Sequence, residues 1–372
     1  MSDKIEKPYA KVIARMRRNV MAMIGLGFIV IALIVSVCGY LIMPDQTPMA
    51  NEMHLEISIK KPLSQADFIR IPKEQQLKEQ SFLTTMWYGR PNADVLIPVD
   101  SYSFGKDSVT VRLTDGDGQA RTYAYADLGV PAEAAARPGQ VIVHKTFALG
   151  TDRYGRDMLS RIILGTRVSL SVGFIAVLIS VIAGVTLGAL AGFYRGWVDD
   201  LISWFINVIW SLPSLLLVIA ISFALGKGFW QVFVAIGLSM WVEVARMVRG
   251  QILAIREVEY VEAARAMGFS GFRIIYKHIL PNIMGPLLVV ASANFASAIL
   301  LEAGLSFLGF GAQPPMPTWG SMVKEHYGYI IIDAAYLAII PGVAIMMLVF
   351  AFNIFSIGLR DAMDMKAGNT NV

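Results

Sequence analysis

Long apolar stretches without charged residues alternate with polar segments along this chain. They cover residues 21–43, 168–194, 201–226, 228–242, 279–301 and 334–359. A helix needs about 20 apolar residues to cross the hydrocarbon layer of a membrane. The stretch at 228–242 is shorter, but Phe229, Trp230 and Trp241 stand near its ends, and aromatic residues favour membrane interfaces. The pattern predicts an all-α membrane protein with six transmembrane helices.

The polar segments divide the rest of the chain. The first apolar stretch is longer than the roughly 7–15 apolar residues of a signal peptide, so we expect it to stay in place as a helix. We therefore expect a cytoplasmic segment at 1–20, a first transmembrane helix at 21–43, an extracytoplasmic insert at 44–145, a transmembrane core at 146–364 and a cytoplasmic tail at 365–372.

The insert has the composition of a soluble domain and a pattern typical of β-structure. Residues 108–113 and 120–125 read as two strands, joined by the turn 114–119 with its two Asp-Gly steps. Asp-Gly favours hairpin turns. The aspartates Asp115 and Asp117 lack the further ligands of an EF-hand loop, so we interpret them as turn residues. We expect a small β-rich domain.

Composition narrows the class of protein. Apolar residues make up 55% of the chain and charged residues only 16%, whereas soluble domains carry about 25% charged residues. The single cysteine, Cys38, excludes a disulfide within the chain and a cysteine-based zinc site. The histidines lie far apart in sequence, and we expect no metal site.

The distribution of basic residues predicts the orientation. Lys and Arg of short loops are retained on the cytoplasmic side. They gather before the first apolar stretch, between the fourth and fifth, and after the sixth, whereas the short loops of the other side hold only Lys227 and Lys324. Both termini are therefore expected in the cytoplasm, with the insert outside.

Small residues and a proline mark two of the apolar stretches. Gly184, Gly188 and Gly192 recur every four residues, which places them on one helix face and lets another helix backbone approach closely. In the third stretch Pro213 follows Trp210 closely and should bend the helix. This bend either lines a central path or is purely structural.

The segment before the second apolar stretch also has helical spacing. Thr151 or Asp152 is a candidate helix cap, and apolar residues recur from Met158 to Ile163. This predicts either an amphipathic helix along the outer membrane interface or an ordinary solvated connector.

A short helix is predicted in the cytoplasmic loop between the fourth and fifth stretches. Residues 259–267 favour a helix, and Gly268 is suited to end it. Tyr260, Ala263, Ala264 and Met267 share one face at spacings of three and four. Such a helix suits insertion into a groove on another protein, or it rests on the lipid headgroups.

This loop carries a resemblance to a known family. It is similar to the cytoplasmic loop of bacterial ABC-importer permeases at Glu262, Ala263, Ala264, Gly268, Leu280 and Pro281. Residues 149–161, 302–309, 314–320 and 352–362 resemble the C-type permease of dipeptide and oligopeptide importers. Together the likeness covers roughly residues 146–364 and the first stretch.

The resemblance implies a permease subunit in the bacterial inner membrane that imports dipeptides or oligopeptides. Its partners would be a second, homologous permease subunit, one or two ATPase subunits and an external substrate-binding protein. Residues 246–281 would couple to the ATPase, with Tyr260 and Met267 joining the matched residues. The translocation path or outer gate would include these candidates: Trp210, Pro213, Glu302, Pro314, Pro315 and Trp319.

Other classes of function fit the sequence less well. The chain has no Gly-x-x-x-x-Gly-Lys-Ser/Thr loop to cradle ATP phosphates, so ATP would be bound by a partner, and we expect neither an enzyme nor a cofactor. A standalone ion-coupled secondary transporter or channel stays as the alternative, although no series of carboxylates or histidines crosses the apolar stretches. The sequence leaves the transported substrate open.

Overall fold

The computed structural model describes residues 8–73, 81–114, 119–130, 138–226 and 228–363. The chain forms two compact units. The first comprises Met1–Leu33, Ser169–Gln313 and Gly342–Val372, and the second comprises Ile34–Val168 and Pro314–Pro341. The long helices α2, α4 and α12 each contribute residues to both units.

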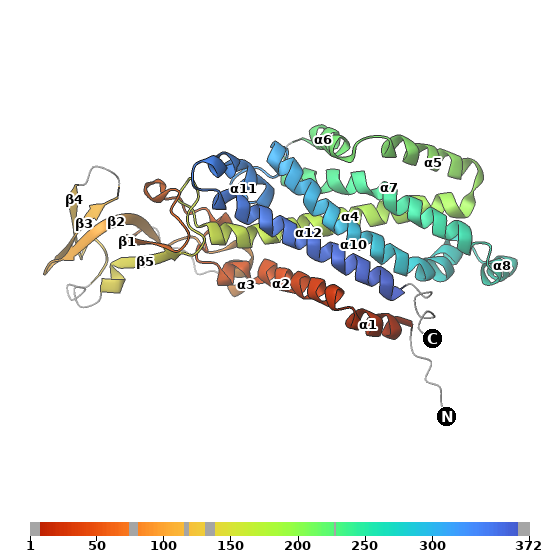
Figure 1. Cartoon of the computed structure of the whole chain (residues 1–372), viewed down its shortest axis with the longest axis horizontal. Helices are drawn as coiled ribbons and strands as arrows, with labels where there is room; N and C mark the ends of the chain where they lie inside the picture. The colour runs from red at the N-terminus through yellow and green to blue at the C-terminus, as the bar shows by residue number, and fades with distance from the viewer. Residues whose placement is uncertain (1–7, 74–80, 115–118, 131–137, 227, 364–372) are drawn as a thin grey trace, which may run out of the picture. The chain divides into compact units, whose positions relative to one another are not determined.

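Long apolar helices dominate the first unit (Figure 1). Those with the length and composition to cross a membrane are α2 (Val20–Ile42), α4 (Met158–Tyr194), α7 (Phe229–Ile255), the continuous helical segment Gly271–Leu308 and α12 (Tyr336–Met363). Two shorter helices, α5 (Gly196–Trp210) and α6 (Ser214–Leu225), form a pair bent by 99°. The described residues thus hold five candidate spans, or six if the bent pair is one span. Helix α1 (Pro8–Arg18) precedes α2 in this unit.

The structure extends several of the predicted spans. The helix expected at 228–242 continues to Ile255 as α7, past the charged residues Glu243, Arg246 and Arg249. Arg249 keeps its charge there because both its Nε and Nη2 donate to the carboxylate of Asp199, at 2.5 and 2.8 Å. The predicted span was therefore too short, because we ended it at the first charged residue of the helix.

The helix predicted from residue 168 begins ten residues earlier. Residues 158–163 are the first turns of α4 and form neither a separate interfacial helix nor a connector. Asp157 caps α4, since its carboxylate accepts from the backbone N–H of Ser160 at 2.8 Å. The prediction of Thr151 or Asp152 as the cap is therefore wrong.

A five-stranded antiparallel sheet forms much of the second unit. Its strands are β1 (Ser64–Pro72), β2 (Asp94–Phe104), β3 (Ser108–Leu113), β4 (Ala120–Ala124) and β5 (Ile142–Phe147), in the order β4-β3-β2-β1-β5 (Figure 1). The register pairs Thr110 with Thr122 in the predicted hairpin of β3 and β4. Residues 115–118 of its turn, with Asp115 and Asp117, lie outside the described residues.

Apolar side chains of the sheet pack together in one buried cluster. Ile69, Val109, Val111 and Ile142 are fully buried there, with Tyr125 packed among them. Their alternation along the strands explains why the sequence could be read as β-structure. Short elements complete this unit: η1 (Pro48–Ala50), η2 (Leu55–Ile57), α3 (Phe82–Tyr88), η4 (Pro138–Gln140), α11 (Trp319–His326) and η6 (Tyr327–Ile331).

The glycine face of α4 lies against α7. A Cβ at Gly184 would come within 2.5 Å of Val244, and one at Gly188 within 2.5 Å of the Ala245 carbonyl. At Gly192 it would meet the Arg249 carbonyl at 3.0 Å. The absence of side chains at these three positions thus permits the close approach of the two helices.

Candidate functional site

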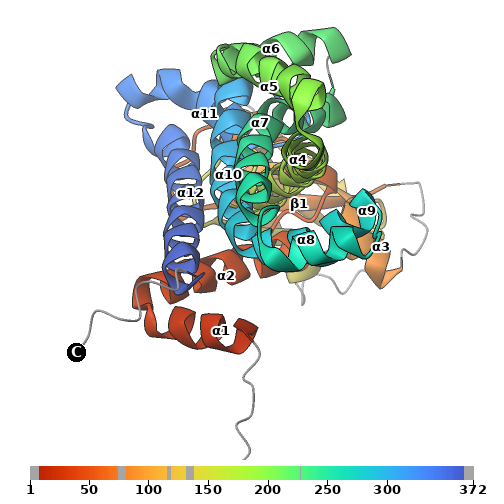
Figure 2. The ribbon, with the colours of Figure 1, turned by 90° about the vertical axis from the view of Figure 1, so that its right-hand side faces the viewer.

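The loop predicted between the fourth and fifth apolar stretches folds into a short helix between two long ones. Helix α8 (Glu259–Ala266) lies beyond the end of α7, and α9 (Gly271–Ile274) follows it (Figure 2). Gly268 has a φ of +79°, the left-handed conformation that ends the helix, and its N–H donates to the Arg265 carbonyl at 2.9 Å. The predicted end of this helix at Gly268 is confirmed.

One side of α8 is anchored to the helical core. Val261 and Ala264 are buried, at 0% and 1% exposure, and pack in a cluster with Val248, Ile252 and Ile274. Burying these side chains removes apolar surface from water or lipid headgroups and fixes the helix on the ends of α7 and α10 (Leu280–Leu308).

Polar contacts add to the anchoring of α8. The Arg265 guanidinium lies over the Phe193 ring at 5.2 Å, and the Asn282 amide donates to the Tyr260 hydroxyl at 3.0 Å. Because Phe193 belongs to α4 and Asn282 to α10, α8 is held from α4 as well and makes a second contact with α10. A displacement of α8 would therefore be transmitted to both.

The opposite side of α8 is open. Tyr260 is 42% exposed and Met267 65% exposed, and Glu262 and Ala263 are exposed as well. The sequence grouped Ala264 with Tyr260, Ala263 and Met267 on one face, but Ala264 points toward the core. Ala264 lies four residues after Tyr260 and three after the buried Val261, so it stands at the edge of the predicted face and adds no exposed surface to it.

A widened turn joins this region to the next long helix. Residues Ile275–Ile279 form a π-helical turn just before Leu280 and Pro281. Pro281 has no N–H to donate to a carbonyl of the preceding turn, and it stands in the first turn of α10, where a proline is tolerated. Leu280 is half-buried against the cluster that anchors α8, and Pro281 is exposed.

The break between α5 and α6 borders a cavity. The helix ends at Trp210, and Pro213, with φ −58° and ψ 123°, precedes α6. The cavity has a volume of ≈ 670 Å³ and is bordered by α5, α6, α7 and α10. Its lining residues are Ile209, Trp210, Leu212, Ser214, Leu215, Leu217, Ser239, Met240, Val242, Glu243, Ser297, Leu300, Leu301 and Gly304.

The candidate path residues divide between this cavity and packed positions. Trp210 lines the cavity, and the Arg246 guanidinium lies over its ring, 3.7 Å from the ring centroid. Glu302, in contrast, is 1% exposed and accepts from the Ser306 hydroxyl at 2.7 Å. Its carboxylate is thus part of helix packing in the first unit.

The other proposed gate residues belong to the second unit. Pro314 and Pro315 are exposed. Trp319 is 3% exposed, its Nε1 donates to the Ile162 carbonyl at 3.0 Å, and its ring lies where a Cβ on Gly165 would clash. Trp319 therefore packs α11 onto α4, whereas Pro314 and Pro315 are the exposed members of this group.

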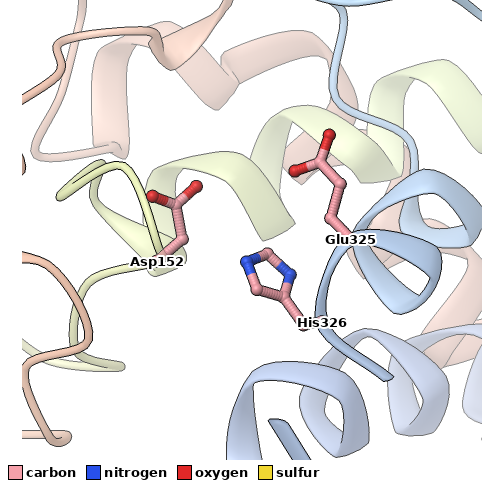
Figure 3. A group of neighbouring side chains, drawn as sticks. All are labelled: Asp152, Glu325 and His326. Atoms are coloured by element: carbon pink, nitrogen blue, oxygen red, sulfur yellow. The ribbon is translucent and has the colours of Figure 1, made fainter. Parts of the chain in front are cut away.

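A buried ion-pair cluster in the second unit was missed by sequence reasoning. Asp152, Glu325 and His326 converge, with ligand atoms within 4.8 Å of one another (Figure 3). Arg156 donates to Asp152 at 2.6 Å and to Glu325 at 3.1 Å, and Arg161 lies 3.6 Å from Asp152. Because the carboxylates already neutralise these guanidinium groups, we assign the cluster a structural role rather than a metal site.

His326 is the neutral member of the cluster. Its side chain is fully buried, and its Nδ1 lies 2.8 Å from the Met322 carbonyl, which fixes the proton on Nδ1. Burial lowers the pKa of His326 below its ordinary value, against the opposing effects of Met322, Asp152 and Glu325. No local sequence signal could have grouped residues so far apart in the chain.

Comparison with known proteins identifies relatives of the core. Residues 184–367 match the family described as binding-protein-dependent transport system inner membrane component. The glutathione transport system permease protein GsiD of Pectobacterium atrosepticum is 44% identical over 218 residues, which cover 59% of this chain and 72% of that protein. The dipeptide transport system permease protein DppC of Alkalihalophilus pseudofirmus is 44% identical over 217 residues, 58% of this chain and 71% of that protein.

A solved structure is also similar to part of the chain. The inward-facing MetNI methionine ABC transporter matches with a TM-score of 0.44 and 20% identity, covering 54% of this chain and 97% of that chain.

Proposed function

We propose that this chain, which belongs to the family of binding-protein-dependent transport system inner membrane components, is the C-type permease subunit of an ATP-driven importer of dipeptides or oligopeptides. Relatives named for dipeptide and glutathione transport support a peptide cargo. The standalone ion-coupled transporter or channel has no support among these relatives.

The proposed assembly has four kinds of subunit. This chain pairs with a second, homologous permease, each permease rests on an ATPase subunit, and an external binding protein delivers the peptide. The bent pair α5 and α6 counts as one span, which gives six spans with both termini in the cytoplasm and the insert at 44–145 outside. The concentration of basic residues in the inner loops supports this orientation.

The observation that carries the proposal is that α8 is buried on one side and exposed on the other. Its buried side ties it to α4, α7 and α10, while Tyr260, Ala263 and Met267 stay available to a groove on the ATPase. Closure of the ATPase around ATP would move α8 as a rigid body. The contacts with Phe193 and Asn282 would pass this movement to the long helices and alternate the access to the path.

Crosslinking tests the docking of α8 directly. In a Cys38→Ser background, Met267→Cys should crosslink to the ATPase subunit of the purified transporter, whereas the control Ile331→Cys should not. Both positions are exposed apolar residues, at 65% and 90%, but Ile331 belongs to η6 in the other unit. Peptide uptake into proteoliposomes should require ATP, the partner permease and the binding protein. A Met267→Cys chain that reaches no ATPase, or uptake by this chain alone, would contradict the proposal.

A further inference from the structure

Helix α7 carries one acidic residue, Glu243, near the middle of its length. It stands 14 residues after Phe229 and 12 before Ile255, so about 20 Å of helix extends on either side at 1.5 Å per residue. Ionisable residues inside membrane segments are costly and are kept where a partner or a water-filled cavity receives the charge. The surroundings of Glu243 therefore indicate its role.

The basic neighbours of Glu243 on α7 contact other side chains. Arg249 is held by Asp199 through two hydrogen bonds, and Arg246 stacks on Trp210 at 3.7 Å. Within the described residues no side chain forms an ion pair or hydrogen bond with Glu243, and its carboxylate is exposed. The carboxylate is thus available to bind a positively charged group.

Glu243 faces the cavity beside the α5–α6 break. Among the described residues that line this cavity, Glu243 alone carries a charge, and the other polar groups are the hydroxyls of Ser214, Ser239 and Ser297. The hydroxyls of Ser239 and Ser297 donate to carbonyls of their own helices, at 2.7 and 3.3 Å. Their oxygens keep lone pairs that accept hydrogen bonds.

This arrangement of acceptors selects the chemistry of an occupant. A volume of ≈ 670 Å³ is that of a small-molecule site. A carboxylate and hydroxyl acceptors set between apolar walls favour a compact cation with several hydrogen-bond donors and an apolar remainder. A primary ammonium group with a short hydrophobic body has these properties.

We propose that Glu243 binds the positively charged amino group of the peptide as it passes through this cavity. The inference rests on the proposed function, because it takes the cargo to be a peptide. The amino terminus would bind the Glu243 carboxylate with help from the hydroxyls, while apolar side chains of the peptide contact the Leu300 and Met240 side of the wall. A cation from the second permease subunit is the competing occupant.

A cysteine reporter in the cavity tests the charge effect in the complete transporter. Leu300 lines the cavity and is 58% exposed, so Leu300→Cys in a Cys38→Ser background gives the reporter. Its rates of reaction with methanethiosulfonates bearing an ammonium or a sulfonate are compared with Glu243 intact, as Glu243→Asp and as Glu243→Gln. The ratio of ammonium to sulfonate rates should fall about tenfold in Glu243→Gln and be largely kept in Glu243→Asp. An unchanged ratio in Glu243→Gln would overturn the proposal.

Protection by peptide tests the occupant. Millimolar Ala-Ala should slow labelling severalfold with Glu243 or Asp present and lose this effect in Glu243→Gln, whereas N-acetyl-Ala-Ala should protect weakly in all three chains. Equal protection by both peptides, or loss of the second permease from the Glu243→Gln complex, would overturn the proposal. Wild-type uptake of peptide is measured in parallel. Intact uptake with failed protection refutes the site alone, whereas absent ATP-driven uptake refutes the proposed function.

Discussion

Glu52 has a half-buried carboxylate with two basic neighbours in the second unit. Its oxygens lie 2.8 Å from the Lys145 ammonium and 3.5 Å from the His54 ring nitrogen. Burial alone would raise the pKa of Glu52, but the interactions with His54 and Lys145 outweigh it and lower the pKa to about 2. Since Lys145 belongs to β5, Glu52 ties the chain before the sheet to its edge strand.

This shift predicts a loss of stability in acid. The pKa is lower in the folded state, so ionised Glu52 stabilises the fold above its unfolded value of 4.5, and this contribution disappears as the pH falls from 4.5 toward 2. The change amounts to at most about 3 kcal/mol. Urea denaturation of the full chain in detergent, followed by hydrogen exchange in β5, should show this pH dependence. It should flatten in Glu52→Gln and persist in the control Glu56→Gln, whose side chain is exposed; equal curves for the two variants would contradict the assignment.

At the scale of elements, the packing of α4 on α7 depends on the missing side chains of three glycines. A methyl group at Gly188 would approach the Ala245 carbonyl to 2.5 Å, and backbone atoms cannot rotate away as a side chain end can. The helices would have to separate. We expect Gly188→Ala to destabilise the purified protein by about 1–3 kcal/mol, seen as a lower denaturation temperature in detergent.

Gly342 provides the matched control for that substitution. It also lies inside a long apolar helix, α12, but a Cβ there would meet no atom within 4 Å. Gly342→Ala should therefore leave the denaturation temperature unchanged or raise it, since alanine favours a helix over glycine. Equal effects of the two substitutions would show that helix propensity rather than close packing determines the result.

Short-range patterns in the sequence were sufficient to predict several elements of the structure. The Asp-Gly turn flanked by alternating residues predicted β3 and β4, and Gly268 predicted the end of α8, because both depend on the backbone preferences of adjacent residues. The orientation of Ala264 was not predictable in this way. It depends on Val248 and Ile274 of neighbouring elements, which receive that side of α8.

At the scale of the whole molecule, the missed features are those that join distant parts of the sequence. Arg167 interrupts the apolar pattern of α4, so the predicted span began only at residue 168, but its guanidinium donates to the carbonyls of Ser36 and Trp87. The buried ion-pair cluster joins Arg156 to Glu325, more than 150 residues away. Likewise, Glu243 gains a role only from the cavity that α5, α6 and α10 form beside α7. Such sites follow from tertiary packing rather than from local pattern.

The distribution of basic residues also predicts the orientation of the chain in the membrane. Basic residues flank the apolar helices mainly at the termini and around α8, so these regions should remain in the cytoplasm and the sheet should lie outside. In a Cys38→Ser background, Ser101→Cys in β2 should react with a membrane-impermeant maleimide on intact cells. Asp361→Cys near the end of α12 should react only after permeabilisation. Both positions are exposed, so differences in burial would not explain the contrast, and labelling of Asp361→Cys in intact cells would reverse the topology and remove α8 from the reach of a cytoplasmic ATPase.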